Sequence, residues 1–154
     1  SMEKSGELIY SLSEIDKAVE LLNNLTQEYS IISLSGHLGA GKTTLVQNFL
    51  RSKGIKEPVL SPTFTYFNQY EIQETNKLNY RNNTKNFYHF DLYRLSGLEE
   101  FVALGFDELI YEPNSISLIE WPEIIEPLLN KSVCHVYLDY SGFDKRILNY
   151  KCSQ

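Results

Sequence analysis

The sequence predicts an α/β fold with three layers, in which helices cover both faces of a mixed, mainly parallel sheet. Short apolar runs typical of strands alternate along the chain with amphipathic runs of helical spacing. One apolar run, at 31–35, leads into a glycine-rich turn that opens a helix. Near the end, 133–140 and 145–150 have the pattern of an antiparallel pair, so we expect antiparallel edge strands.

The first elements are expected to be a strand, a helix and a second strand. Residues 7–10 are typical of a short strand. Ser13 then has the character of a helix N-cap, with Asp16 where a capping box carries an acidic residue. Apolar residues recur at helical spacing over 14–28, which predicts an amphipathic helix. Residues 31–35 are apolar on both faces, as expected of a central parallel strand.

A P-loop follows this strand. Gly36, Gly41, Lys42 and Thr43 satisfy the pattern G-x-x-x-x-G-K-[ST] between a strand and a helix. Glycines let the backbone N–H groups point at phosphate oxygens, and the helix start adds its positive end. We expect the Lys42 ammonium to reach the outer phosphates and the Thr43 hydroxyl to bind Mg2+. The predicted nucleotide cradle comprises Gly36, His37, Leu38, Gly39, Ala40, Gly41, Lys42, Thr43 and Thr44.

The rest of the chain continues the alternation. The helix after the P-loop is expected to end at Gly54. The patterns predict strands near 65–72, 87–94 and 115–120, and short helices within 98–112, interrupted at Gly105, and 124–129. The polar, asparagine-rich stretch 73–86 is expected to be an exposed loop or hairpin tip. These elements fit a three-layer P-loop nucleotide-binding fold.

Two carboxylates compete for the metal that a P-loop requires. Asp91 and Glu120 each end an apolar strand pattern. The carboxyl ends of strands in an open α/β sheet lie beside the bound phosphates, so either residue could hold Mg2+ or its water. The spacing of the residues leaves the choice between them open.

Composition limits the class of protein. The 154 residues, 1–154, suit one domain, and the net charge of −6 disfavours DNA or general nucleic-acid binding. Two cysteines, Cys134 and Cys152, are too few for a disulfide framework or a four-ligand zinc site and suggest a reducing, cytoplasmic setting. No apolar run is long enough to cross a membrane. Ser1 ahead of Met2 is typical of a tag remnant.

Four motifs in order carry a resemblance. They are the P-loop at 36–44, Ser61-Pro62-Thr63, His89-Phe90-Asp91-Leu92-Tyr93-Arg94-Leu95 and Glu120-Trp121-Pro122-Glu123. With them the chain resembles the bacterial TsaE (YjeE) family of P-loop ATPases. The resemblance implies an ATP- and Mg2+-dependent accessory protein for N6-threonylcarbamoyladenosine, a modified adenosine of tRNA. It implies a threonylcarbamoyl-transferase complex (TsaB/TsaD-like proteins) as partner, indirect contact with tRNA, and weak ATPase activity without the partner.

The resemblance also implies roles for individual residues. Thr43 and Glu120 would be the Mg2+ ligands, and Lys42 would grip the phosphates. Asp91 would position the attacking water. Further positions are Thr63 as a switch-like catalytic residue near the γ-phosphate, Trp121 and Glu123 beside the nucleotide, and Arg146 near the base. His37 stands where most members carry Asp, but the loop uses its backbone there, so phosphate binding is expected to survive.

Three other functions remain open from the sequence. A small-molecule or nucleoside kinase would need an acceptor pocket and an arginine-bearing lid, and the four arginines show no such cluster. A GTPase would carry N-K-x-D, whereas residues 76–79 read Asn-Lys-Leu-Asn. The third alternative is a nucleotide-sensing assembly factor without useful turnover, which an Asp91→Asn variant would distinguish from an ATPase.

Overall fold

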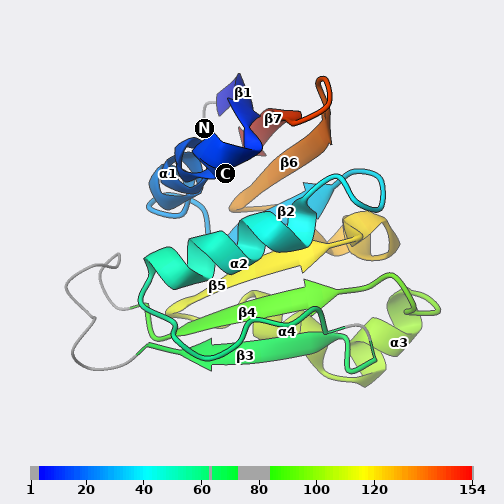
Figure 1. The fold of residues 1–154 in the computed structure, drawn as a ribbon. Helices are drawn as coiled ribbons and strands as arrows, with labels where there is room; N and C mark the ends of the chain where they lie inside the picture. Colours follow the sequence, from blue (N-terminus) through cyan, green and yellow to red (C-terminus); the bar gives the residue numbers. More distant parts are fainter. Residues whose placement is uncertain (1–3, 63, 73–83, 154) are drawn as a thin grey trace.

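A seven-stranded mixed sheet forms the centre of the computed structural model, which describes residues 4–62, 64–72 and 84–153 (Figure 1). The order is β1-β7-β6-β2-β5-β4-β3. The strands β6, β2, β5 and β4 are parallel to one another, whereas β7 and β3 pair antiparallel with their neighbours. Their bounds are β1 Lys4–Ser11, β2 Ile31–Ser35, β3 Phe67–Glu71, β4 Asn86–Asp91, β5 Ser115–Glu120, β6 Val133–Tyr140 and β7 Lys145–Ser153. The predicted α/β class with antiparallel edge strands is confirmed.

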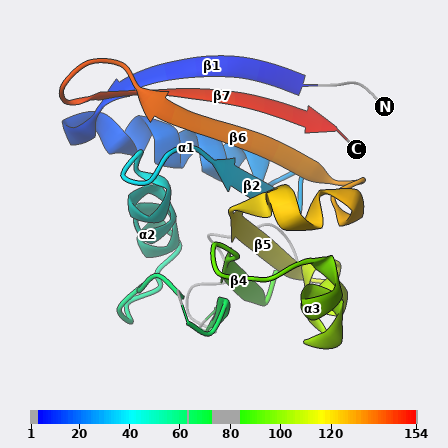
Figure 2. The ribbon, with the colours of Figure 1, turned by 90° about the vertical axis from the view of Figure 1, so that its right-hand side faces the viewer.

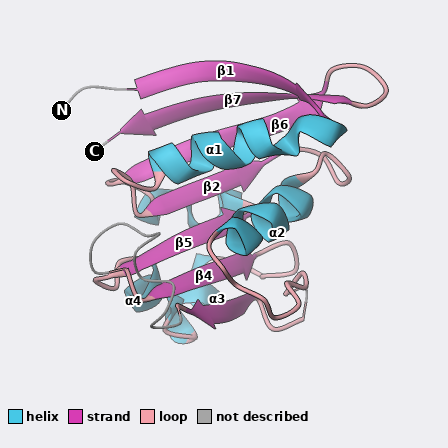
Figure 3. Cartoon of the chain, turned by 60° about the vertical axis from the view of Figure 1, so that its left-hand side comes forward, coloured by secondary structure: helices cyan, strands magenta, loops and turns pink. Residues whose placement is uncertain are grey.

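Helices cover both faces of this sheet. One face carries α1 (Ile15–Leu25) and α2 (Lys42–Ser52), and the other carries α3 (Leu98–Ala103), α4 (Phe106–Ile110) and the 3-10 segment η3 (Pro122–Leu128). Figure 2 shows α2 and α3 on opposite sides, and Figure 3 shows α1 and α2 side by side on their face. A short 3-10 turn, η1 (Leu12–Glu14), connects β1 to α1. Within the described ranges, no helix is long and apolar enough to cross a membrane.

Each face of the sheet has its own hydrophobic core. Under α1 and α2, Phe49 meets Phe87 edge to face, with ring centroids 5.7 Å apart. On the other face Phe90, Phe101 and Phe106 form an aromatic cluster with centroid distances of 5.5–5.9 Å. Both arrangements are geometries that aromatic pairs favour. The sheet is therefore packed against helices on both of its faces.

The parallel strands bring the site residues to one edge. In the strand register, Glu120 of β5 is the partner of both Leu34 of β2 and Asp91 of β4. Because side chains alternate along a strand, His89 and Asp91 share the face of Phe87, toward α2. The end of β2, Glu120 and Asp91 therefore meet beside the start of α2, as expected for an α/β sheet.

Some local expectations differ from the structure. The predicted bounds of β2 and β5 and the interruption at Gly105 are confirmed. The Ser13 N-cap is wrong, because α1 starts at Ile15 with Glu14 at its cap position and no capping side chain. Residues 12–14 form η1 instead. Most of the predicted 73–86 loop, 73–83, lies outside the described residues. Of the rest, position 84 is buried, position 85 is exposed, and position 86 begins β4.

The two cysteines are partners across neighbouring strands. Cys134 of β6 and Cys152 of β7 are directly opposite in the antiparallel register, fully buried, and joined as a disulfide. The expectation of no disulfide framework stands, since this is a single bond. The count alone did not predict the pairing, which follows from strand register. The reducing compartment inferred from that count stays a prediction.

We expect Phe49→Ala to destabilise the fold strongly. The substitution leaves a cavity between α2 and β4, where Phe49 is fully buried against Phe87. Losing a buried phenyl group of this kind costs about 3–5 kcal/mol of unfolding free energy. Urea unfolding followed by circular dichroism measures it. Val102→Ala on α3, where the side chain is 46% exposed, is the control and should change stability by no more than about 0.5 kcal/mol. Equal losses for both variants would contradict the assignment of Phe49 to the core.

Candidate functional site

The P-loop joins the end of β2 to the start of α2. Gly36 and Gly41 have φ of 148° and 105°, where a glycine is favoured. Inside the loop the Ala40 N–H donates to the His37 carbonyl at 3.0 Å, which closes a turn. Gly41 is the N-cap of α2. The first N–H groups of α2, which have no acceptor within the helix, therefore lie at the end of the loop and suit an anion.

The hairpin of β6 and β7 braces the loop from outside. The Tyr140 hydroxyl donates to the Gly39 carbonyl at 2.9 Å, and Arg146 Nε donates to the Ala40 carbonyl at 3.2 Å. The Arg146 guanidinium also stacks over the Tyr140 ring at 4.4 Å. These contacts hold two consecutive carbonyls of the loop. Arg146 was expected near the base of the nucleotide. In the structure its side chain contacts the P-loop, at the Ala40 carbonyl.

Lys42 is the first residue of α2, and its side chain folds back over the loop. Its ammonium donates to the carbonyls of Gly36 at 2.5 Å and His37 at 3.2 Å, and lies 4.3 Å from the Trp121 ring centroid. Burial lowers the pKa of Lys42, whereas nearby carboxylates, Glu120 foremost, act in the opposite direction. The Lys42 ammonium is therefore held between the loop carbonyls and the Trp121 ring, close enough to the carboxylates of the site to feel their charge.

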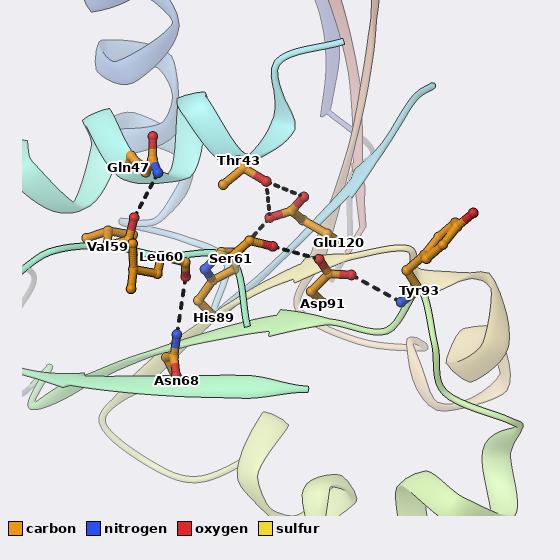
Figure 4. Close-up of polar contacts among 10 residues, drawn as sticks. All are labelled: Thr43, Gln47, Val59, Leu60, Ser61, Asn68, His89, Asp91, Tyr93 and Glu120. Carbon is orange, nitrogen blue, oxygen red and sulfur yellow. Dashed lines mark hydrogen bonds and ion pairs between the residues drawn. The ribbon is translucent and has the colours of Figure 1, made fainter. Parts of the chain in front are cut away.

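Glu120 and Thr43 are hydrogen-bonded beside this cation. The Thr43 hydroxyl lies 3.0 and 3.1 Å from the two carboxylate oxygens of Glu120 (Figure 4). On its other side the carboxylate contacts His89 Nε2 at 2.5 Å. Glu120 is only 2% exposed. The hydrogen bonds to these two neighbours fix the orientation of the buried carboxylate.

Asp91 occupies the end of the next strand. The Ser61 hydroxyl donates to one of its carboxylate oxygens at 2.9 Å, and the Tyr93 backbone N–H donates to the other at 3.1 Å (Figure 4). Asp91 is thereby tied both to the segment before β3 and to the turn after β4. Each oxygen keeps a lone pair for a further hydrogen bond.

Among the cavities that border the loop in the described part of the chain, two share some of its residues. One of about 420 Å³ is lined by Leu38, Gly39, Gly41, Lys42, Thr43, Thr44, Ser61, Asp91, Tyr93, Arg94, Glu120 and Trp121. The other, of about 400 Å³, is lined by Tyr10, Leu12, Ile15, Gly39, Gly41, Thr44, Asn48 and Arg146. They share Gly39, Gly41 and Thr44, so the loop and the first turn of α2 form a common wall between them.

The residues present suit a magnesium ion that is shared with phosphates. Among the described residues, no group of three or more His, Cys, Asp and Glu side chains could hold a metal. Mg2+ commonly takes only one or two protein ligands and fills its shell with waters and substrate phosphates. The hydroxyl of Thr43 and the buried carboxylate of Glu120, 3.0 Å apart, are oxygen donors of that kind.

The structure assembles most of the predicted site residues but not all. Lys42, Thr43, Asp91, Glu120 and Trp121 line the larger cavity, together with most of the loop. Arg146 lines the second cavity. Glu123 lines neither of these two cavities; its carboxylate lies 3.4 Å from the Ser35 hydroxyl. Thr63 lies outside the described residues.

Several residues of the site were missing from the predicted set. Ser61 and Tyr93 belong to motifs that the sequence showed, yet only Thr63 and Asp91 were given roles there. His89 was noted two positions before Asp91, a spacing that places both on one face of a strand. Tyr10 and Tyr140 lie far from the P-loop in sequence, and no local pattern marks them.

Gly36→Ala is expected to disrupt the site while Gly97→Ala is not. A β-carbon on Gly36 would overlap the carbonyl oxygen of Leu138 on β6, a backbone atom that cannot turn away, and φ of 148° adds strain. The loop would therefore shift, lowering the melting temperature and weakening binding of a labelled nucleoside triphosphate at least tenfold. At Gly97 a β-carbon would meet nothing within 4 Å. Nucleotide binding by Gly36→Ala at the wild-type level would contradict this packing.

Comparisons with known proteins agree with the geometry. A family model described as Threonylcarbamoyl adenosine biosynthesis protein TsaE matches residues 9–148. A Haemophilus influenzae protein named tRNA threonylcarbamoyladenosine biosynthesis protein TsaE is 38% identical over 125 residues, which cover 80% of this chain and 72% of that protein. A Rickettsia felis protein of the same name is 35% identical over 137 residues, covering 87% and 72%.

The fold is also known from a solved structure. The crystal structure of YdiB from Bacillus subtilis superposes with a TM-score of 0.66 at 25% identity, covering 100% of this chain and 89% of that one. The family match extends from β1 to β7 and so includes the P-loop, Asp91 and Glu120. The chain therefore belongs to the TsaE family, whose members take part in the biosynthesis of threonylcarbamoyladenosine in tRNA.

Proposed function

We propose that this protein binds and hydrolyses ATP with Mg2+ and thereby drives a threonylcarbamoyl-transferase complex that modifies tRNA. One observation carries the proposal: the Thr43 hydroxyl and the Glu120 carboxylate are hydrogen-bonded at the wall of the P-loop cavity, next to Lys42. A hydroxyl in the first helical turn and an acidic side chain at the end of a neighbouring strand are the usual metal-holding pair of P-loop ATPases.

The phosphate end of ATP would lie in the larger cavity. The N–H groups at the start of α2 face it, and Lys42 supplies a cation that can contact the outer phosphates. Tyr140 and Arg146 hold the carbonyls of Gly39 and Ala40, which supports a loop whose backbone is fixed at these two positions.

Thr43 and Glu120 are the proposed Mg2+ ligands. The Thr43 hydroxyl donates a hydrogen bond to Glu120, so the lone pairs of the Thr43 oxygen are available to bind the ion. The Glu120 charge is buried and oriented, which favours a cation at this point. An ion held by these two residues would help to offset the charge that develops on the phosphate oxygens.

Asp91 is the proposed positioning group for the attacking water. It lines the same cavity, and its two hydrogen-bond donors orient the carboxylate. A lone pair on each oxygen is left to accept a hydrogen bond from water. The switch role of Thr63 near the γ-phosphate stays a prediction, because Thr63 lies outside the described residues.

The nucleoside end is proposed to occupy the second cavity. Tyr10 and Leu12 offer apolar surface there, and Asn48 and Arg146 offer hydrogen-bond donors. Because this cavity shares the loop wall with the first, one nucleotide could extend through both. Arg146 would then combine its expected place near the base with its contact to the loop.

Surface character supports a protein partner at this site. Leu38 and Tyr93 are exposed and line the cavity, Leu60 precedes Ser61, and Phe64 packs on Arg94 of the cavity wall while itself being exposed. Exposed apolar side chains around a polar site are typical of an interaction surface. Because this protein has a net charge of −6, we expect tRNA to be contacted mainly through the partner proteins.

The partner should stimulate turnover. We expect slow release of phosphate from Mg-ATP by the protein alone and faster release when the threonylcarbamoyl-transferase proteins are added, because the exposed rim would be covered and the site completed. A coupled phosphate assay with and without the partner, in Mg2+ and in EDTA, measures this. Absence of both stimulation and ATP-dependent complex formation would exclude the proposal.

Asp91→Asn should separate binding from hydrolysis. The amide has the same shape but is a poor acceptor for the water proton, so turnover should fall by roughly 10²- to 10⁴-fold, as for loss of a catalytic acid or base. Binding of labelled ATP should stay within a few-fold of wild type. If this variant still supports tRNA modification in a reconstituted reaction, the protein would instead be a nucleotide-sensing assembly factor.

A further inference from the structure

His89 is a fully buried polar residue beside the proposed metal ligands. It lies in the middle of β4, between Asn68 of β3 and Leu118 of β5 in the strand register, and is 0% exposed. Its side chain shares the α2 face with that of Asp91. Histidine in such a place must find hydrogen-bond partners within the protein.

Within the described part of the chain the ring makes one hydrogen bond, and that bond is to Glu120. Nε2 lies 2.5 Å from Oε2 of the carboxylate, and both side chains are buried, so no water competes for the contact. The other ring nitrogen, Nδ1, has no partner among the described residues. The hydrogen bond that the described residues provide for this ring is therefore made to a proposed metal ligand.

The contact limits how the Glu120 carboxylate can turn. Oε2 accepts from Nε2–H of His89 on the β4 side, while Thr43 donates from the α2 side. With these two donors in place, the plane of the carboxylate is fixed and the Thr43 hydroxyl proton is directed at Glu120. The remaining lone pairs of Thr43 and of Glu120 Oε1 are then the ones open to the cavity.

We infer that His89 is a positioning residue that holds Glu120 in the orientation needed to bind Mg2+ with Thr43. The inference rests on the proposed function, because it assigns a role only toward the metal. It adds a requirement for an Nε2–H donor at position 89, which neither the P-loop nor the acidic residues supply. Groups of this kind around metal ligands commonly change metal affinity by 10- to 100-fold when they are removed.

Three substitutions test the inference. His89→Leu removes the donor, His89→Gln keeps an N–H donor at about the reach of Nε2, and His135→Leu is the matched control. His135 is also a strand histidine; it is half-buried, is hydrogen-bonded to Ser33 at 2.6 Å, and does not line either of the two cavities described above. Each variant is first compared with wild type by circular dichroism and thermal unfolding.

Metal affinity is the readout. Mn2+, a spectroscopic substitute for Mg2+, is titrated into the protein with a non-hydrolysable ATP analogue and followed by electron paramagnetic resonance. His89→Leu should weaken Mn2+ binding by 10- to 100-fold, and His89→Gln should recover to within a few-fold of wild type. Binding of the labelled analogue in EDTA should be unchanged in all variants, as should Mn2+ binding by His135→Leu.

The outcomes separate the two proposals. If wild type binds the analogue with no dependence on Mn2+, the Mg2+ role of the proposed function fails. If wild type depends on Mn2+ but His89→Leu matches it, only the His89 inference fails. Equal loss for His89→Leu and His89→Gln, or a loss that is the same in EDTA, would also overturn it.

A measurement on the wild-type protein keeps the test decisive if His89→Leu does not fold. Nitrogen-15 NMR of labelled histidine reports which ring nitrogen carries the proton. We expect a proton on Nε2 of His89, since only then can it donate to Glu120, and a change in its resonance when Mg2+ and the analogue are added. A neutral ring protonated on Nδ1 alone would overturn the inference.

Discussion

The hydrogen bond between Thr43 and Glu120 connects the first turn of α2 to the end of β5. It depends on how the helices and strands around it are packed. Thr43 is held by α2, whose Phe49 and Leu50 are fully buried in the core. Glu120 ends β5, which must lie next to β2 in parallel register for its carboxylate to face the start of α2. A shift of one residue in β5 would turn the carboxylate to the opposite face of the sheet.

The same constraint explains which features could be predicted from the sequence. The P-loop, β2 and β5 have local signals, since glycine spacing and unbroken apolar runs are visible within a few residues. Because parallel strands end at one edge, a carboxylate after each apolar run was enough to propose Asp91 and Glu120. The sequence could not show the donors that orient them, such as His89 and the Tyr93 N–H.

Features that depend on distant contacts were not predictable in this way. Tyr140 and Arg146 reach the P-loop across 101 and 106 positions of sequence, so the brace becomes apparent only when β6 lies beside β2. The pairing of Cys134 with Cys152 likewise follows from the register of β6 and β7. The error at the start of α1 has a local cause. Residues 12–14, which resemble a helix cap in sequence, form a 3-10 turn, and the helix begins after them.

The position of α2 also links ligand binding to global stability. One helix supplies the first turn of the phosphate cradle and a large part of the main core, so the cradle cannot survive unfolding of that core. A ligand that binds only the folded chain adds about 2.7 kcal/mol to the unfolding free energy at 100 times its dissociation constant. The resistance of this protein to heat and proteolysis would then vary with the nucleotide concentration around it.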